Sequence, residues 1–155
     1  MDETDPNYTK IMDYIARNPA AVLGTVDDEG PHGAVVYVIP ASHGTICFVT
    51  KSGTKKYQNL TAHPKVSLTF FNERESTTLQ ASGHAYVADD SNGLKDLVMD
   101  KVTKAHAMVA DWLPPVTKVQ SGEYAVIGIE LDTARLADYG SIDINGPVFT
   151  ELKAH

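Results

Sequence analysis

Apolar residues near the start of the chain recur at the three- and four-residue spacing of a helix. Asp5 followed by Pro6 is a favourable helix start, because aspartate caps the first N–H groups and proline suits the first helical position. The apolar stripe stops before Asn18 and Pro19, and its members are Tyr8, Ile11, Met12 and Ile15. We therefore expect a helix over residues 6–18 that covers one end of a sheet.

From Ala20 onward the pattern changes to runs rich in β-branched and aromatic residues, separated by short polar turns. These runs predict antiparallel strands at residues 20–26, 32–40, 45–50, 66–71 and 77–88. Gly83 interrupts the last of them, and glycine inside a strand often marks a bulge or a bend at a barrel corner. A second amphipathic helix is expected from Leu94 to Trp112, because its rhythm continues up to Pro114.

Residues 123–131 predict another strand and 134–139 one more, while the periodicity weakens from Gly140 on, as in a loop or a short terminal extension. Many short antiparallel strands with few helices predict a mainly β fold, a closed or half-closed barrel. Periodicity alone does not separate this barrel from a sandwich. The length suits one domain, with an N-terminal helix in 1–19, the barrel with inserted helices in 20–139 and a tail in 140–155.

Composition narrows the functional classes. The net charge of −7 argues against a nucleic-acid partner, and no apolar run approaches the roughly 20 residues that cross a bilayer. The acidic N-terminus lacks the basic and apolar regions of a signal peptide. Cys47, the single cysteine, lies in an apolar strand, so we expect a core residue in a reducing compartment, with the cytoplasm as the location.

The densest basic cluster of this acidic chain lies between two apolar strands and directly before an expected helix. The segment combines hydroxyl and ammonium groups with one glycine, in the order Thr50, Lys51, Ser52, Gly53, Thr54, Lys55 and Lys56. A helix N-terminus adds unpaired N–H groups, so the set can hold a phosphate. The spacing of a P-loop is absent, and composition alone leaves a solvated connecting loop as the alternative.

Residues 48–56 resemble the flavin-phosphate segment of the pyridoxamine 5′-phosphate oxidase family, where an aromatic–x–Thr strand end precedes a hydroxyl residue and two basic residues. Residues 34–39 align with the family strand beside the isoalloxazine ring. Residues 59–70 are similar to the family's N-P-x-V-x-L-x-F signature, with His63 at the asparagine position. The resemblance covers residues 20–89. It implies the FMN-binding split barrel, an antiparallel Greek-key barrel of six strands that forms a homodimer with flavin at the interface.

The resemblance also implies which residues contact FMN. It places the phosphate or ribityl chain beside Thr50, Thr54, Lys55 and Lys56, and we add the hydroxyl of Ser52. It places the ring beside Val36, Tyr37, Val38, Val49 and Thr50, although a half-buried strand aromatic is an equal alternative for Tyr37. Thr78 stands where the family has a flavin-contacting glutamine, and Gln80 is its neighbour on the same face, so either side chain could reach the flavin.

Departures from the family oxidase bear on the reaction. Ala34 stands where the oxidase has a phosphate-binding arginine, and the C-terminal tryptophan and arginine that grip pyridoxal phosphate are missing. The closer likeness is to the general-stress and uncharacterised flavin-binding members, so oxidation of pyridoxamine phosphate is not expected. We expect a flavin-dependent oxidoreductase acting on an unidentified small molecule, with unassigned catalytic residues. The first alternative is a flavin carrier or stress sensor without turnover.

The second alternative is another cofactor in the same barrel. Relatives of this fold hold haem or a deazaflavin, and His63 or His84 could then serve as the axial ligand of haem. The six histidines are scattered without paired spacing, so no metal-ion site is expected. Trp112 lies on the stripe of its expected helix, where a core or dimer-interface role is favoured over stacking on flavin.

Overall fold

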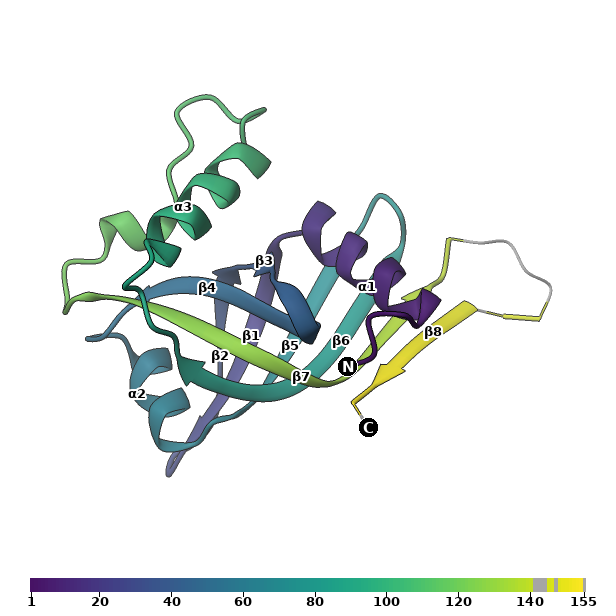
Figure 1. The fold of residues 1–155 in the computed structure, drawn as a ribbon, viewed down its shortest axis with the longest axis horizontal. Helices are drawn as coiled ribbons and strands as arrows, with labels where there is room; N and C mark the ends of the chain where they lie inside the picture. Colours follow the sequence, from purple (N-terminus) through teal and green to yellow (C-terminus); the bar gives the residue numbers. More distant parts are fainter. Residues whose placement is uncertain (141–144, 147, 155) are drawn as a thin grey trace.

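The computed structural model describes residues 1–140, 145–146 and 148–154, which form a curled antiparallel sheet flanked by three helices (Figure 1). The helices are α1 (Pro6–Arg17), α2 (Lys55–Ala62) and α3 (Leu94–Ala105), with 3-10 turns at Ser42–Gly44 and Pro115–Lys118. The strands are β1 (Ala20–Asp27), β2 (Gly30–Tyr37), β3 (Ile39–Pro40), β4 (Thr45–Lys51), β5 (Lys65–Asn72), β6 (Thr77–Val87), β7 (Tyr124–Asp138) and β8 (Val148–Lys153). No described helix is long and apolar enough to cross a membrane.

The order of the strands closes the sheet into a split barrel. The sheet runs β2-β1-β5-β6-β7-β4-β3, with β8 paired to the second half of β7. β2 and β3 are consecutive pieces of one extended segment, separated at Val38, whose N–H donates to the carbonyl of Pro19 at 2.8 Å. Because β2 pairs with β1 and β3 pairs with β4, this segment joins the two edges of the sheet. The predicted mainly β split barrel is confirmed, with eight strands where six were expected.

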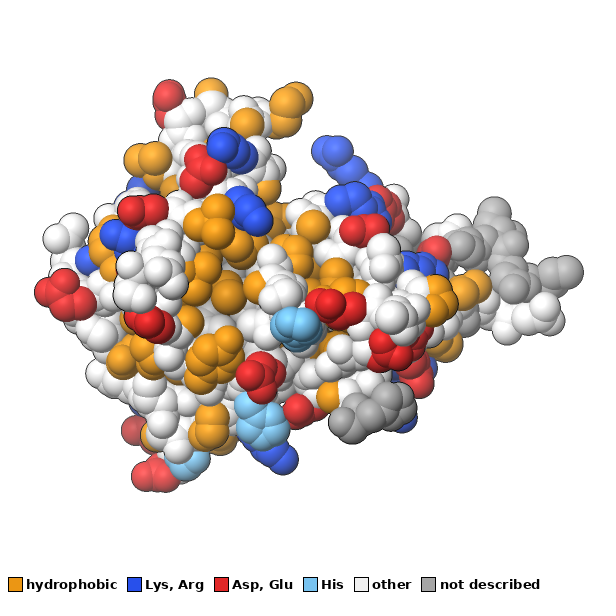
Figure 2. Space-filling view, in the orientation of Figure 1, with side chains coloured by type: hydrophobic (Ala, Val, Ile, Leu, Met, Phe, Trp, Pro, Cys, Tyr) orange, Lys and Arg blue, Asp and Glu red, His pale blue; other side chains and the backbone are white. Residues whose placement is uncertain are grey.

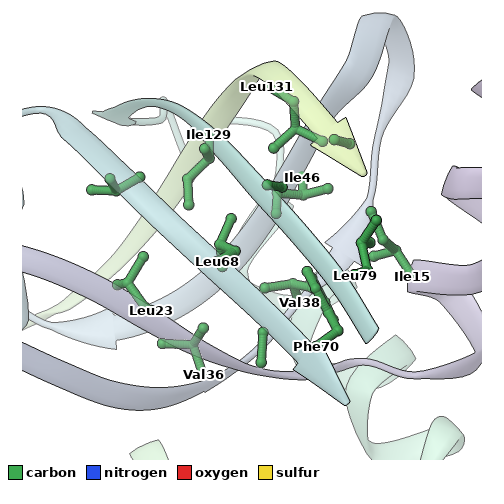
Figure 3. Packing of buried hydrophobic residues seen from close by; sticks show 14 of the residues in the cluster. Ile15, Leu23, Val36, Val38, Ile46, Leu68, Phe70, Leu79, Ile129 and Leu131 are labelled. Atoms are coloured by element: carbon green, nitrogen blue, oxygen red, sulfur yellow. The ribbon is translucent and has the colours of Figure 1, made fainter. Parts of the chain in front are cut away.

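The first helix is confirmed with its predicted cap. The carboxylate of Asp5 accepts a hydrogen bond from the N–H of Asn7 at 2.8 Å, and Pro6 occupies the first helical position. Ile11 and Ile15 are fully buried in the main core, and Figure 3 shows Ile15 beside Leu79 of β6. The helix therefore covers one opening of the barrel with its apolar stripe.

The main core fills the interior of the barrel with side chains from alternating strand positions, as Figure 3 shows for Leu23, Val36, Val38, Ile46, Leu68, Phe70 and Ile129. A second, smaller core lies on the outside of β3, β4 and β7, under α3. Its buried members are Ile39, Cys47, Val98, Val102 and Val126. Hydrophobic side chains gather on this face between α3 and the strands (Figure 2). Cys47 is thus the buried core residue that its strand predicted, and burial raises the pKa of its thiol.

The second helix is shorter than its apolar rhythm predicted, and this prediction was wrong over residues 106–112. α3 ends at Ala105, and the chain then passes through turns in which Asp111 has a φ of 56°. The imidazole of His106 bonds to the carbonyl of Val102 at 2.8 Å and stacks on Trp112, with ring centroids 3.9 Å apart. Trp112 thus packs back against the preceding turn, and Val109 is 54% exposed.

Two predicted strands at 123–131 and 134–139 are one continuous strand, β7. The register between β6 and β7 shifts between Ser82 and Gly83, which leaves Asp132 as the extra residue of β7. A Cβ atom on Gly83 would lie 2.2 Å from the carbonyl oxygen of Glu130, so this site requires glycine. The predicted bulge at Gly83 is confirmed, and it explains the interrupted periodicity. In the tail, residues 148–153 form β8, while 141–144, 147 and 155 lie outside the described residues.

Candidate functional site

A cavity of about 100 Å³, open to solvent, lies where β2 and β4 separate. One side, which we call the barrel wall, consists of Val35, Val36, Tyr37, Val49, Thr50 and Lys56. The opposite side, which we call the helical wall, consists of Val98, Met99 and Val102 of α3 with Pro114, Pro115, Val116 and Val119 of the segment before β7.

Part of the predicted flavin site meets in this cavity. The barrel wall contains the predicted residues Val36, Tyr37, Val49, Thr50 and Lys56, which come from β2, β4 and the first turn of α2. Beside these residues β2 does not pair with β4. The next piece of the same segment, β3, does pair with β4, and this keeps the two strands close together. The split of the barrel therefore creates the space that these residues line.

Lys56 is the cation of the cavity. Burial lowers the pKa of its ammonium group, because the low-dielectric surroundings disfavour the charged form. No carboxylate among the described residues lies within ion-pair distance of it. A half-buried ammonium without a counter-ion is a site at which an anion would be stabilised.

Lys55, the other lysine of the predicted basic pair, is not part of the cavity lining. Its ammonium lies 2.5 Å from the carboxylate of Asp27, at the end of β1, and the same carboxylate lies 2.9 Å from the ring of His32. These two partners hold the pKa of Asp27 well below its usual range, and Asp27 in turn raises the pKa of Lys55. Glu29 lies close to Asp27 and His32, but the ammonium of Lys55 already supplies the positive charge there.

The loop between β4 and α2 is fastened to the loop before β7. The N–H of Ser52 donates to the carbonyl of Glu123 at 2.8 Å, and its hydroxyl accepts from the N–H of Glu123 at 2.9 Å. A Cβ atom on Gly53 would lie 1.9 Å from the hydroxyl of Ser121. Gly53 therefore permits the close backbone approach that its position suggested, but toward Ser121 and Gly122. The predicted hydroxyl of Ser52 is likewise engaged in holding the loop.

The remaining hydroxyls shape the start of α2. Thr54 is the N-cap residue, whose side chain accepts from the N–H of Tyr57 at 3.4 Å and donates to the carbonyl of Lys51 at 2.8 Å. The hydroxyl of Thr50 lies 3.2 Å from that of Thr54. A buried bond from Asn59 to Thr25, at 3.2 Å, docks α2 on β1. These contacts fix the direction in which Lys56 leaves the helix.

Besides Ser52, Thr54 and Lys55, three more predicted residues lie outside the cavity lining. Val38 is fully buried among the barrel core residues. Thr78 and Gln80 lie on the outer face of β6, the side turned away from the barrel core. The register connects Val35 through Val22 and Thr69 to Gln80, which is three strand spacings, or about 14 Å, since neighbouring strands lie about 4.8 Å apart. Gln80 is therefore not part of the described cavity lining.

The helical wall was not predicted as part of a site. Val98 and Val102 lie on the predicted amphipathic helix, to which no ligand role was assigned, and Pro114 was interpreted only as the end of that helix. The signal that could have revealed them is the unusual content of the connection between α3 and β7. Valine and proline there carry no polar side chain, and an apolar connection normally covers another surface.

The histidines that could serve a haem do not lie in the cavity wall. His84 is on the outer face of β6, 3.0 Å from the carboxylate of Asp132, and His63 is the exposed C-cap residue of α2. Trp112 packs in the second core, and its ring contacts Tyr37 edge-on at 5.3 Å. Trp112 thus packs against Tyr37 of the barrel wall, as its predicted core role implied.

Comparison with known proteins agrees with this architecture. Over 94% of this chain and 97% of the other, the fold matches General Stress Protein 26 from Bacillus anthracis at 20% identity and a TM-score of 0.63. A pyridoxamine 5′-phosphate oxidase-related, FMN-binding protein from Nostoc punctiforme matches at 11% identity, 99% and 100% coverage and a TM-score of 0.62. HutZ, the haem storage protein from Vibrio cholerae, matches at 16% identity, 79% and 88% coverage and a TM-score of 0.57.

No curated protein sequence matches this chain. The model of the family described as pyridoxamine 5′-phosphate oxidase, in contrast, matches residues 9–138, a span that runs from α1 to the end of β7 and includes the whole barrel wall. The chain belongs to the pyridoxamine 5′-phosphate oxidase family.

Proposed function

We propose that this protein binds FMN in the cavity between β2 and β4 and acts as a flavin-dependent oxidoreductase on a small molecule. The observation that carries the proposal is the ammonium of Lys56, half-buried in the barrel wall without a described counter-ion. The phosphate of FMN is an anion that would satisfy it. The family match and the FMN-binding relative from Nostoc punctiforme support the choice of flavin.

The residues present fit the group. Lys56 would hold the phosphate, the first turn of α2 would add backbone N–H groups, and Val36, Tyr37, Val49 and Thr50 would contact the ring or the ribityl chain. FMN supplies the electron-transfer chemistry when it is bound, and the chain supplies anchoring, an apolar surface and exclusion of water. Haem is less well supported, because neither of the predicted axial histidines, His63 and His84, belongs to the described cavity lining.

We further propose that the functional unit is a homodimer with flavin at the interface. Family resemblance assigns flavin contacts both to the barrel wall and to Thr78 or Gln80, yet these lie three strands apart in one chain. A second copy packed on the outer face would bring its own Gln80 to the cavity. Apolar side chains on that face support such packing, among them Val22, which is 48% exposed, Val35 at 59% and Phe71 at 64%.

A cytoplasmic location completes the proposal. Cys47 is the single cysteine and is buried, so the chain builds no internal disulfide. A single buried thiol without a disulfide partner suits a reducing compartment. The location can be checked by fractionating cells that express the tagged chain and locating it beside a cytoplasmic marker.

The central test is FMN binding by the purified protein and by Lys56→Met, followed through flavin absorption after desalting. We expect the wild-type protein to retain yellow flavin and Lys56→Met to lose roughly 10- to 100-fold in affinity, because a charge-assisted contact is worth about 1.5–3 kcal/mol. Lys104→Met, which removes an exposed lysine of α3, is the matched control and should bind FMN as the wild type does. Equal affinity in both variants would contradict the assignment of Lys56.

A second measurement separates an enzyme from a carrier. The FMN-loaded protein is mixed anaerobically with NADH or NADPH, and the loss of the oxidised-flavin band is recorded. Reduction by one donor supports the oxidoreductase. Tight flavin binding without reduction by either donor supports a carrier, and a haem Soret band in place of flavin bands would overturn both.

A further inference from the structure

We infer that the molecule which reacts beside the flavin is an uncharged, apolar compound, held between the cofactor and the helical wall. The inference rests on the proposed function, since it takes FMN to occupy the barrel wall. It concerns the opposite side of the cavity, which neither the family resemblance nor the comparisons assign to a ligand. The observation behind it is the unequal distribution of polar side chains between the two walls.

Every polar side chain of the described cavity lining belongs to the barrel wall, and they are Tyr37, Thr50 and Lys56. The helical wall contributes valine, methionine and proline only. Val98 and Val102 are at most 3% exposed and are packed in the second core, so their position is fixed by the fold. A ligand lying against this wall meets aliphatic carbon and no hydrogen-bonding side chain.

The charge of the ligand follows from what surrounds it. The only charged group in the described lining is Lys56, and FMN phosphate would neutralise it. A carboxylate or phosphate on a second ligand would then enter an apolar space without a counter-ion, which is strongly unfavourable. An uncharged compound gains from leaving water on both faces, against the flavin on one side and the helical wall on the other.

The lysines nearest the helical wall lie outside the cavity lining, and these include Lys101 of α3 and Lys118, which stands between Val116 and Val119. Lys95, at the start of α3, is paired with Asp96 at 3.3 Å and lies 5.3 Å from the ring of Tyr124. Lys104 is paired with Asp100 at 2.7 Å on the exposed side of the helix. Lys95 and Lys104 are thus engaged with their own neighbours, and neither belongs to the cavity lining.

The test uses two probes of equal size that differ in charge, naphthalene-2-carboxamide and naphthalene-2-carboxylate. FMN is titrated first, which by itself tests the proposed function. Each probe is then titrated by calorimetry into the FMN-loaded protein. We expect the amide to bind at least about tenfold more tightly than the carboxylate, because only the carboxylate leaves an uncompensated charge in the apolar space.

Two variants locate the discrimination. Val116→Lys places an ammonium on the helical wall and should reduce or reverse the preference for the amide. Val109→Lys is the matched control, since Val109 belongs to the same connection but is 54% exposed and outside the lining, and it should leave the preference unchanged.

Each outcome decides. If FMN binds and the carboxylate equals or exceeds the amide, or if Val116→Lys leaves their ratio unchanged, the inference is wrong while the proposed function stands. If neither probe binds the FMN-loaded protein, the helical wall covers the flavin itself and the inference is again wrong. If FMN does not bind, the proposed function fails and the inference fails with it.

Discussion

Gly122 lies against Gly53 so closely that a Cβ atom on Gly122 would stand 2.4 Å from the backbone nitrogen of Gly53. The two glycines belong to the loop before β7 and the loop before α2. Their contact links two parts of the cavity, because one loop continues from the helical wall and the other leads to Lys56. A substitution here should therefore affect ligand binding as well as stability.

Gly122→Ala is predicted to destabilise the protein and to weaken FMN. Gly122 has a φ of 83°, which costs alanine about 1–3 kcal/mol, and the added methyl group also pushes the loop of Ser52 and Gly53 away. Gly93→Ala is the control, since Gly93 has a φ of 73° but no atom within 4 Å of an added Cβ. Urea unfolding and FMN titration of both variants measure the difference. Equal losses of stability and unchanged FMN affinity would show that the close approach has no functional effect.

Asp27→Asn is predicted to remove a pH-dependent part of stability. The pKa of Asp27 is lowered in the folded protein by Lys55 and His32, so the unfolded chain binds a proton more readily. The stabilisation is therefore fully present above the unfolded pKa of about 3.9 and declines as the pH falls below it. Urea unfolding at pH 7, 5, 4 and 3 should show the wild type more stable than the variant at neutral pH, with the gap narrowing below pH 4. A gap that is constant across this range would refute the assignment.

Mixing two defective variants tests whether the site is shared between chains. Lys56→Met and Gln80→Ala should each weaken FMN binding in their own homodimers. In a mixed dimer of the two, one site carries both changes and the other carries neither. Refolding an equimolar mixture should therefore restore tight binding to about one site in four, as statistical pairing gives half of the dimers as mixed. A site formed within one chain would show no recovery.

Phe71→Glu is predicted to convert the proposed dimer to a monomer. Phe71 is 64% exposed on the outer face of β5, and a carboxylate there would be desolvated in a dimer interface. Leu97→Glu, at a residue of α3 that is 47% exposed, adds the same charge outside this face and should leave the dimer intact. Sedimentation velocity of the wild type and the two variants measures their oligomeric states. If Phe71→Glu is still a dimer, the interface does not include the outer face of β5.

The sequence predicted features whose causes are local. The cap at Asp5, the short strands and the bulge at Gly83 each follow from residues within a few positions of one another. The end of α3 was missed because the stacking of His106 on Trp112 competes with continued helix, and apolar periodicity does not record that competition. The continuity of β7 through Asp132 was missed because the bulge disturbs the alternation without ending the strand.

The candidate site was predictable in part for the same reason. Thr50 and Lys56 come from one contiguous segment and meet in the cavity, together with the β2 residues placed by family resemblance. The pairing of Lys55 with Asp27 joins residues that are far apart in sequence, and either lysine alone looked equally suited to a phosphate. The helical wall depends on how α3 docks, which no local pattern specifies.

The separation of β2 from β4 has a consequence for the motions of the protein. Elsewhere the barrel wall is held together by ladders of backbone hydrogen bonds, but no such ladder joins residues 35–37 of β2 to residues 49–50 of β4, which lie on the same side of the cavity. A ligand bound there would contact both strands, which no backbone hydrogen bonds connect at these residues. The free energy of local opening at this line should therefore rise with the affinity of whatever occupies it, so that amide exchange in β2 and β4 reports occupancy before any chemistry occurs.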